Sequence, residues 1–267
     1  LGDVYKRQEQ IIRGMKREAL PGFMRQHYTP ENMVIAASGN LYHEQVVELA
    51  QRHFADLPRA ERAAPMEADY MGGEYRELRD LDQAHIVLGF DAPGYGQPDY
   101  YPSMLLSTLL GGGMSSRLFQ EIREKRGLVY SIYSFTAPAQ DGGLFGIYAG
   151  TGESEAAELI PVTLEELEKV QRSVSEAELN RARAQLKAGL LMSLESTGSR
   201  CEQLARQWQV FGRIIPVEET VGKINAVTVE DIRASAAKIF RQKPTLATIG
   251  PVAQVPKFSA IIDRLAA

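Results

Sequence analysis

The sequence predicts an α+β fold in which helices pack on a sheet in two-layer units, one complete and one partial. A hairpin signal joins two strand-like runs, and two capping boxes mark the starts of helices. In addition, the order helix, aromatic residue, proline, apolar run and glycine occurs twice, ending at Gly39 and at Gly250. Two copies of one α+β unit, most of the first being missing, would explain this repetition; a chance recurrence of a common order is the alternative.

The first part of the chain predicts helix, buried strand, turn and helix. Residues 17–28 have a helical pattern, and residues 33–38 (MVIAAS) form a short apolar run that ends at Gly39. Residues 43–57 repeat apolar side chains at spacings of three and four, which predicts one apolar face on a helix.

A change of composition follows and predicts a linker. Residues 58–73 (PRAERAAPMEADYMGG) are rich in Pro, Ala, Arg, Glu and Gly and have little periodicity, which is typical of an exposed connection. We therefore divide the chain into a first-domain remnant (residues 1–57), a linker (58–74) and a second domain (75–267).

The second domain is predicted to open with a strand and two helices. Residues 84–90 form the strand, and a helix runs from Pro98 to Leu110 and stops at the glycine run 111–113. Ser115 and Ser116 are placed to cap the next helix, residues 117–126, which Gly127 ends.

The remaining elements are a hairpin, helices and a last strand. Residues 128–136 and 144–149 are β-rich runs that are apolar on both faces, which predicts a hairpin in a sheet covered on both sides. Ser175 and Thr228 each begin a helix with a capping box, and residues 245–249 form the final strand.

Composition excludes several classes of protein. With 30 Lys and Arg against 34 Asp and Glu, the net charge is −4, and no basic stripe is present to bind nucleic acid. No window approaches the roughly 18 apolar residues that a membrane span needs, so we expect a soluble protein of the bacterial cytoplasm or periplasm. Because the chain does not begin with Met, we expect a processed product or a fragment of a longer protein.

The histidines do not form a zinc motif. A zinc hydrolase needs two His one helical turn apart with a nearby carboxylate, whereas His43 and His53 are ten residues apart, about 280° around a helix. His27 and His85 have no such partner either, and no nucleophile elbow or phosphate-binding loop occurs. We therefore expect no metal ligand in this chain.

The strongest candidate chemistry is the pair Arg123 and Tyr130. A helix end and the strand after it can bring a guanidinium and a phenol to one place, where both donate hydrogen bonds to a carbonyl oxygen as it becomes an oxyanion. The alternative is a solvated arginine and a tyrosine that is buried for packing.

The segment 110–130 closely resembles the second-half signature of the pitrilysin/insulinase family of zinc metallopeptidases, which includes the mitochondrial processing peptidase. The resemblance rests on the glycine run, Ser-Ser-Arg-Leu, and Arg-x-x-x-x-Gly-Leu-x-Tyr. It extends to residues 27–40 and 227–251, and so covers nearly the whole chain from about Ile11.

The resemblance implies half of a two-halved, clam-like peptidase. In this family the first half carries a zinc motif, H-x-x-E-H, which is absent here, so zinc would be bound by a missing upstream half. The second half supplies an arginine and a tyrosine that polarise the scissile carbonyl, and these map onto Arg123 and Tyr130. Substrates are peptides or unfolded segments, often bound as an added strand. The resemblance also assigns the glycine run (Gly111, Gly112 and Gly113) and the two serines after it (Ser115 and Ser116) to substrate binding. For the glycines, a simple helix cap is the alternative.

Three readings stay open. In the first, the chain is the C-terminal part of a zinc metalloendopeptidase and is inactive alone. In the second, it is a non-metal subunit that supplies Arg123 and Tyr130 to a zinc-bearing partner in a homo- or heterodimer. In the third, it is a catalytically inactive scaffold member of the family. Retention of both residues speaks against the scaffold, which has no need of an oxyanion clamp.

Overall fold

The computed structural model describes residues 9–59 and 67–266, and the chain divides into two compact units. The smaller unit combines the chain before residue 67 with Ser196–Gly212. The larger unit comprises Glu67–Glu195 and Arg213–Ala267.

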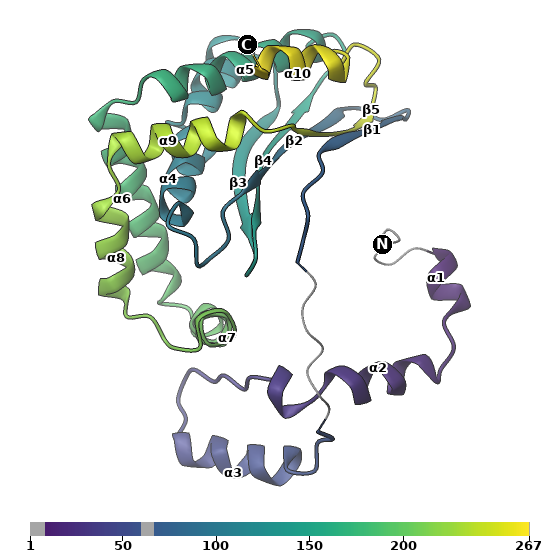
Figure 1. The fold of residues 1–267 in the computed structure, drawn as a ribbon, viewed down its shortest axis with the longest axis vertical. Coiled ribbons are helices and arrows are strands. Elements are labelled where there is room, and N and C mark those ends of the chain that lie inside the picture. The colour runs from purple at the N-terminus through teal and green to yellow at the C-terminus, as the bar shows by residue number, and fades with distance from the viewer. Residues whose placement is uncertain (1–8, 60–66, 267) are drawn as a thin grey trace. The chain divides into compact units, whose positions relative to one another are not determined.

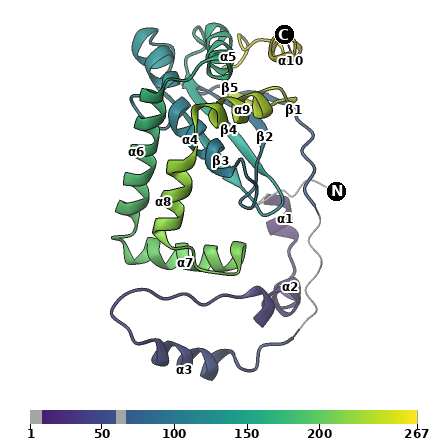
Figure 2. The ribbon, with the colours of Figure 1, turned by 60° about the vertical axis from the view of Figure 1, so that its left-hand side comes forward.

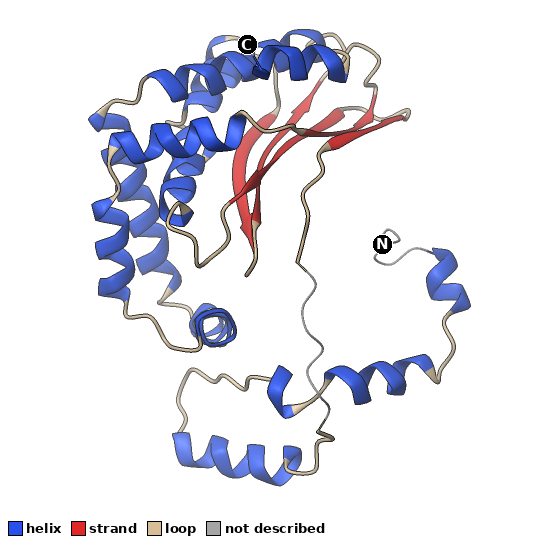
Figure 3. Cartoon of the chain, in the orientation of Figure 1, coloured by secondary structure: helices blue, strands red, loops and turns tan. Residues whose placement is uncertain are grey.

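A five-stranded mixed sheet forms the centre of the larger unit (Figures 1 and 3). Its order is β1-β5-β2-β4-β3, in which β1 and β5 are parallel and the other neighbours are antiparallel. The strands are β1 (Gly73–Leu78), β2 (Ala84–Ala92), β3 (Ser131–Pro138), β4 (Gly143–Thr151) and β5 (Thr245–Gly250).

Helices cover one face of this sheet. They are α4 (Tyr100–Gly111), η2 (Phe119–Lys125), α5 (Ala156–Arg172), α6 (Glu176–Ser193), α8 (Val217–Ala226), α9 (Val229–Phe240) and α10 (Phe258–Ala266). Among them, α4, η2 and α9 contact strands directly, and Figure 2 shows α6 and α8 alongside each other next to α4. The predicted α+β fold with helices layered on a sheet is confirmed.

Aromatic packing joins the two layers. Phe90 on β2 and Phe145 on β4 are fully buried and meet Phe240 of α9 edge to face, with ring centroids 5.1 and 5.3 Å apart. Such pairs stabilise by about 0.5–1.5 kcal/mol beyond the apolar area they bury. These three rings therefore fix α9 against the centre of the sheet.

The other face of the sheet is only partly covered, so the prediction of a sheet buried on both sides is wrong. Tyr133 and Phe135 of β3 are 46% and 37% exposed, and Tyr133 lies 5.0 Å from Tyr148 between ring centroids. Along β2, buried and half-buried residues alternate. Strand β3, whose sequence is apolar on both faces, thus presents aromatic side chains on the face of the sheet that the helices do not cover.

Both predicted capping boxes are present. The Ser175 hydroxyl accepts a hydrogen bond from the Glu178 backbone N–H, and the Glu178 carboxylate accepts one from the Ser175 backbone N–H. Thr228 and Asp231 form the same reciprocal pair at the start of α9. Local sequence therefore fixes where α6 and α9 begin.

The smaller unit consists of helices without a developed core. It contains α1 (Glu9–Gly14), α2 (Ala19–His27), η1 (Pro30–Asn32), α3 (His43–Phe54) and α7 (Thr197–Phe211). The Cys201 thiol of α7 donates to the Ala36 carbonyl at 3.0 Å. Of the described residues of this unit, only Thr29 is buried.

The strand predicted at residues 33–38 does not form. Met33 has extended backbone angles (φ −116°, ψ 139°), but the segment is not paired with another strand within the described chain. An apolar run becomes a strand only when a neighbour supplies the ladder hydrogen bonds. The prediction of a buried strand here is wrong.

The predicted linker contains structure at its C-terminal end. Tyr70 donates to the Gly89 carbonyl at 3.0 Å and contacts the Thr245 hydroxyl at 2.8 Å, and β1 begins at Gly73. Residues 60–66 of the predicted linker, and residues 1–8 of the predicted first domain, lie outside the described residues. None of the described helices is both long and apolar enough to span a bilayer.

Candidate functional site

The glycine run ends α4 and allows close packing. Gly111 is buried, and a Cβ at this position would collide with the Ser134 backbone nitrogen of β3 and lie 2.7 Å from its hydroxyl oxygen. Gly112 is the helix C-cap, and its N–H donates to the Thr108 carbonyl at 3.0 Å. Gly113 is half-buried beside Gln185 of α6. A helix-ending role is therefore present, and substrate binding by these glycines stays a prediction.

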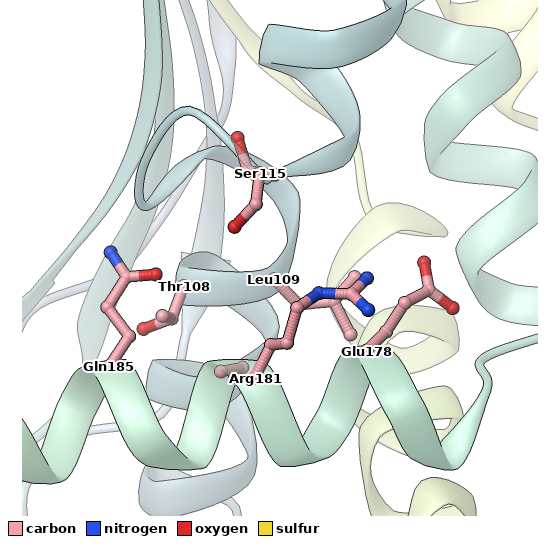
Figure 4. Close-up of a pocket in the computed structure, with 8 residues that line it drawn as sticks. Thr108, Leu109, Ser115, Glu178, Arg181 and Gln185 are labelled. Atoms are coloured by element: carbon pink, nitrogen blue, oxygen red, sulfur yellow. The ribbon is translucent and has the colours of Figure 1, made fainter.

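The two serines of the motif line a small cavity against α6 (Figure 4). Its walls come from the end of α4, the segment after it and one face of α6: Thr108, Leu109, Ser115, Ser116, Glu178, Arg181, Ala182 and Gln185. The Ser116 hydroxyl is buried and has no hydrogen-bond partner among the described residues, so its predicted capping of the next helix is wrong. The structure brings both serines to Arg181 and Gln185 of α6, which no sequence motif indicates, and to Glu178, the partner of Ser175 in the predicted capping box.

An ion pair between Arg117 and Glu178 connects the segment before η2 to α6. The Arg117 guanidinium donates to both carboxylate oxygens of Glu178, at 2.6 and 3.0 Å, and to the Ser173 carbonyl at 2.8 Å. Burial alone would raise the pKa of Glu178, but the hydrogen bonds from Arg117 and Ser175 outweigh burial and lower this pKa to about 2. The Ser-Ser-Arg-Leu motif contained this arginine, so Arg117 was visible in the sequence, although its partner was not.

Arg123 lies in a π-helical segment, η2, rather than in regular α-helix. Its guanidinium carbon is 4.7 Å from the centroid of the Phe119 ring, and its side chain is exposed. The Arg123 carbonyl accepts from the N–H of Gly127, which has a left-handed φ of 66° and turns the chain. Segments of π-helix are rare and occur often at functional sites.

Tyr130 precedes the edge strand β3 and is 64% exposed. Its N–H donates to the Gly150 carbonyl at 2.9 Å, and the preceding Leu128 and Val129 are buried. The Leu128 N–H also donates to the carbonyl of Ile122, at 3.0 Å. Tyr130 is therefore accessible rather than buried for packing, and its backbone is well anchored.

The two predicted donors thus lie on one anchored segment with both side chains exposed to solvent. Their convergence on a single carbonyl oxygen stays a prediction. Among residues 9–59 and 67–266, no group of three or more His, Cys, Asp or Glu side chains could hold a metal ion. His85 instead makes a 2.8 Å hydrogen bond, through Nδ1, to the Tyr148 hydroxyl.

Comparisons with known proteins agree with this architecture. The family model described as "Peptidase M16 inactive domain" matches residues 14–186. An uncharacterized zinc protease of Rickettsia felis is 36% identical over 236 residues, covering 88% of this chain and 57% of that protein. One of Mycobacterium tuberculosis H37Rv is 38% identical over 249 residues, covering 91% and 57%. The chain spans little more than half the length of these curated relatives.

The fold is also found in a solved assembly. A chain of complex III2 from Candida albicans, determined with Inz-5 bound, matches with a TM-score of 0.87 and 23% identity. The match covers 97% of this chain and 64% of that one, and at this identity it shows the fold alone. Because the family model spans well over half of the chain, the resemblance read from the glycine run, the Ser-Ser-Arg-Leu motif and the Arg-to-Tyr motif is confirmed, and the chain belongs to the M16, or pitrilysin, family of peptidases.

Proposed function

We propose that this chain is the C-terminal part of a zinc-dependent metalloendopeptidase and that it binds the peptide substrate and polarises the scissile carbonyl. Support comes from the zinc-protease relatives and from the two exposed donors of the family motif. The described residues offer no ligand set for zinc. We therefore assign the metal ligands to the part of the peptidase outside this chain, with residues 1–57 as the end of the metal-bearing domain and 75–267 as the substrate-binding domain.

The observation that carries the proposal is the exposure of Arg123 and Tyr130 on an anchored segment. A guanidinium and a phenol that donate to a carbonyl oxygen gain strength as negative charge develops there, so they stabilise the transition state more than the substrate. The anchoring matters because a donor held in place needs no reorganisation during the reaction. Arg117 and Glu178 act here as positioning residues for η2.

An extended peptide is the substrate form that suits this site. Strand β3 is the last in the sheet order, and Tyr130 precedes its first residue. An edge strand presents unpaired backbone groups that an added strand can satisfy. A peptide or unfolded segment paired with β3 would bring one of its carbonyls near Tyr130.

The test uses the longer, zinc-loaded protein that contains this chain. Arg123→Ala and Tyr130→Phe should each lower kcat by about 10²- to 10³-fold, the usual loss of one oxyanion donor. Lys125→Ala is the matched control, since Lys125 is an exposed cation of the same segment that pairs with Glu121 at 2.7 Å. Peptide cleavage within a few fold of wild type in both variants would refute the oxyanion role.

A second candidate is a non-metal subunit that supplies the same donors to a zinc-bearing partner. The description of the matched domain as inactive favours a chain that contributes no metal site of its own. Mixing this chain with a separately purified zinc-bearing family member distinguishes the two: restored cleavage that is lost with Arg123→Ala supports the partner-subunit reading. If mixing restores no cleavage and only one continuous longer chain is active, the result supports the first candidate, in which this chain is the C-terminal part of the peptidase.

A further inference from the structure

A second cavity lies in the larger unit at the end of the sheet where β2 stops and β4 and β5 begin. Its volume is about 290 Å³, close to the lower end for small-molecule sites. The register places Ala92 opposite Gly143 at this end. The last turn of α9, which leads into β5 (Figure 1), contributes Lys238 and Ile239 to the lining. The residues that matter to its chemistry are Asp69, Asp91, Asp99, Asp141, Ser235 and Lys238.

The charges of this cavity are mostly negative. Of its four aspartates, Asp99 pairs with Lys238 at 2.6 Å, and Asp141 accepts a hydrogen bond from the Ala68 N–H at 2.8 Å. Asp69 and Asp91 have neither an ion pair nor a hydrogen bond with any residue that the structure describes. Two carboxylates are thus left without a counter-charge in the described part of the cavity.

The charge of Asp91 acts on the cavity wall. Burial raises the pKa of the Tyr70 hydroxyl, and the negative charge of Asp91 raises this pKa further, against the opposing hydrogen bonds with Thr245. Asp91 itself is half-buried, so water screens its charge less than that of a surface carboxylate. The C-terminal end of α9 adds partial negative charge, because helix carbonyls point outward there.

Ser235 supplies an independent sign of a ligand. It lies on α9, is only 3% exposed, and lines the cavity. Its hydroxyl oxygen has no hydrogen-bond partner among the described residues. Buried hydroxyls are normally satisfied, so an unsatisfied one in a cavity points to a group that arrives from outside.

We propose that this cavity binds an alkylammonium group, supplied by a small free diamine or by a lysine side chain of a peptide. An ammonium has three donors and no acceptor, which matches two unpaired carboxylates and a hydroxyl that can accept. A metal ion fits less well, because the described aspartates do not form a group that could coordinate one. This site is separate from Arg123 and Tyr130 and does not depend on the proposed peptidase role.

The experiment is a calorimetric titration of the 267-residue chain at low ionic strength. The probes are 1,4-diaminobutane, Nα-acetyl-lysine methylamide and the neutral isostere 1,4-butanediol. We expect saturable binding of at least one amine and none of the diol. Asp91→Asn and Ser235→Ala should each weaken amine binding, by about tenfold for the charged partner and less for the hydroxyl.

The matched control is Asp263→Asn, an exposed aspartate of α10 outside the cavity, which should leave the affinity unchanged. Circular dichroism confirms that each variant is folded. Tighter binding of the diamine identifies a small molecule as the ligand, and tighter binding of the lysine derivative identifies a peptide. No saturable binding below about 10 mM, equal binding of the diol, or equal weakening by Asp263→Asn would overturn the proposal.

Discussion

Replacing Glu178 with glutamine should destabilise the larger unit by about 2 kcal/mol at neutral pH, and this loss should disappear in acid. The pKa of this carboxyl is about 2 in the folded chain, against 4.5 for an unpaired glutamate. At 1.36 kcal/mol per pH unit the linkage amounts to about 3 kcal/mol. Because the side chains of Arg117 and Glu178 are still 15% and 21% exposed, screening by water reduces this figure.

The direction of the pH effect follows from the lowered pKa. The Glu178 carboxylate binds a proton less readily in the folded state than in the unfolded state. The contribution of the ion pair to the unfolding free energy is therefore complete above pH 4.5 and is lost as the pH falls from 4.5 to about 2. The gap in unfolding free energy between wild type and Glu178→Gln should therefore close across this interval.

Urea unfolding followed by far-ultraviolet circular dichroism measures this gap. Tryptophan fluorescence would be the wrong probe, because the single tryptophan, Trp208, belongs to the smaller unit. Glu176→Gln is the control, since Glu176 lies in the same first turn of α6 and differs in lacking the pair with Arg117. An equal gap at pH 7 and near pH 2, or an equal loss in the control, would refute the ion-pair argument.

Four further substitutions test the packing and the capping of the larger unit. Phe240→Ala removes the ring that joins both layers and should cost about 3–5 kcal/mol in urea unfolding; less than about 1 kcal/mol would contradict its central place. Gly111→Ala should destabilise the unit by at least about 1 kcal/mol, because the added Cβ would collide with Ser134. Gly189→Ala in α6 is the control: its Cβ meets no other atom, so it should stabilise the unit by about 0.5–1 kcal/mol. A change in unfolding free energy of the same sign in both variants would refute the close approach of Gly111 to Ser134. Thr228→Ala removes a capping box and should lower the melting temperature, at a cost of about 1 kcal/mol, and an unchanged melting temperature would count against the cap.

Local signals predicted the fold well where the physics is local. The capping boxes at Ser175 and Thr228 depend on residues three positions apart, and the hairpin between β3 and β4 pairs neighbouring segments from Pro138 with Gly143 to Ser131 with Gly150; all of them form. The exposed edge strand β1 was missed because its sequence, GEYREL, is mostly polar and its partner among the described strands, β5, lies about 170 residues later. Pairing at that distance leaves no local trace.

The errors have the same origin. Residues 33–38 have the composition of a strand but no neighbour within the described chain, and the π-helical turn at Arg123 depends on how residues 122–128 fold back on themselves. The pair Arg123 and Tyr130 could be found from the motif, and their exposure agrees with that choice. The polar face of α6 could not, since only folding brings Arg181 and Gln185 to the two serines.

The smaller unit is built from two separate segments of the chain, and this determines when it can be completed during synthesis. Its last helix, α7, is encoded after four helical elements and four strands of the larger unit, and the chain then returns to the larger unit at Arg213. During synthesis the smaller unit therefore stays incomplete until residue 212 has left the ribosome. By that time β2, β3 and β4 can already pair with one another, whereas β1 still lacks its partner β5. Cutting the chain near residue 60 would likewise not release the smaller unit intact, because α7 would remain covalently attached to the other piece.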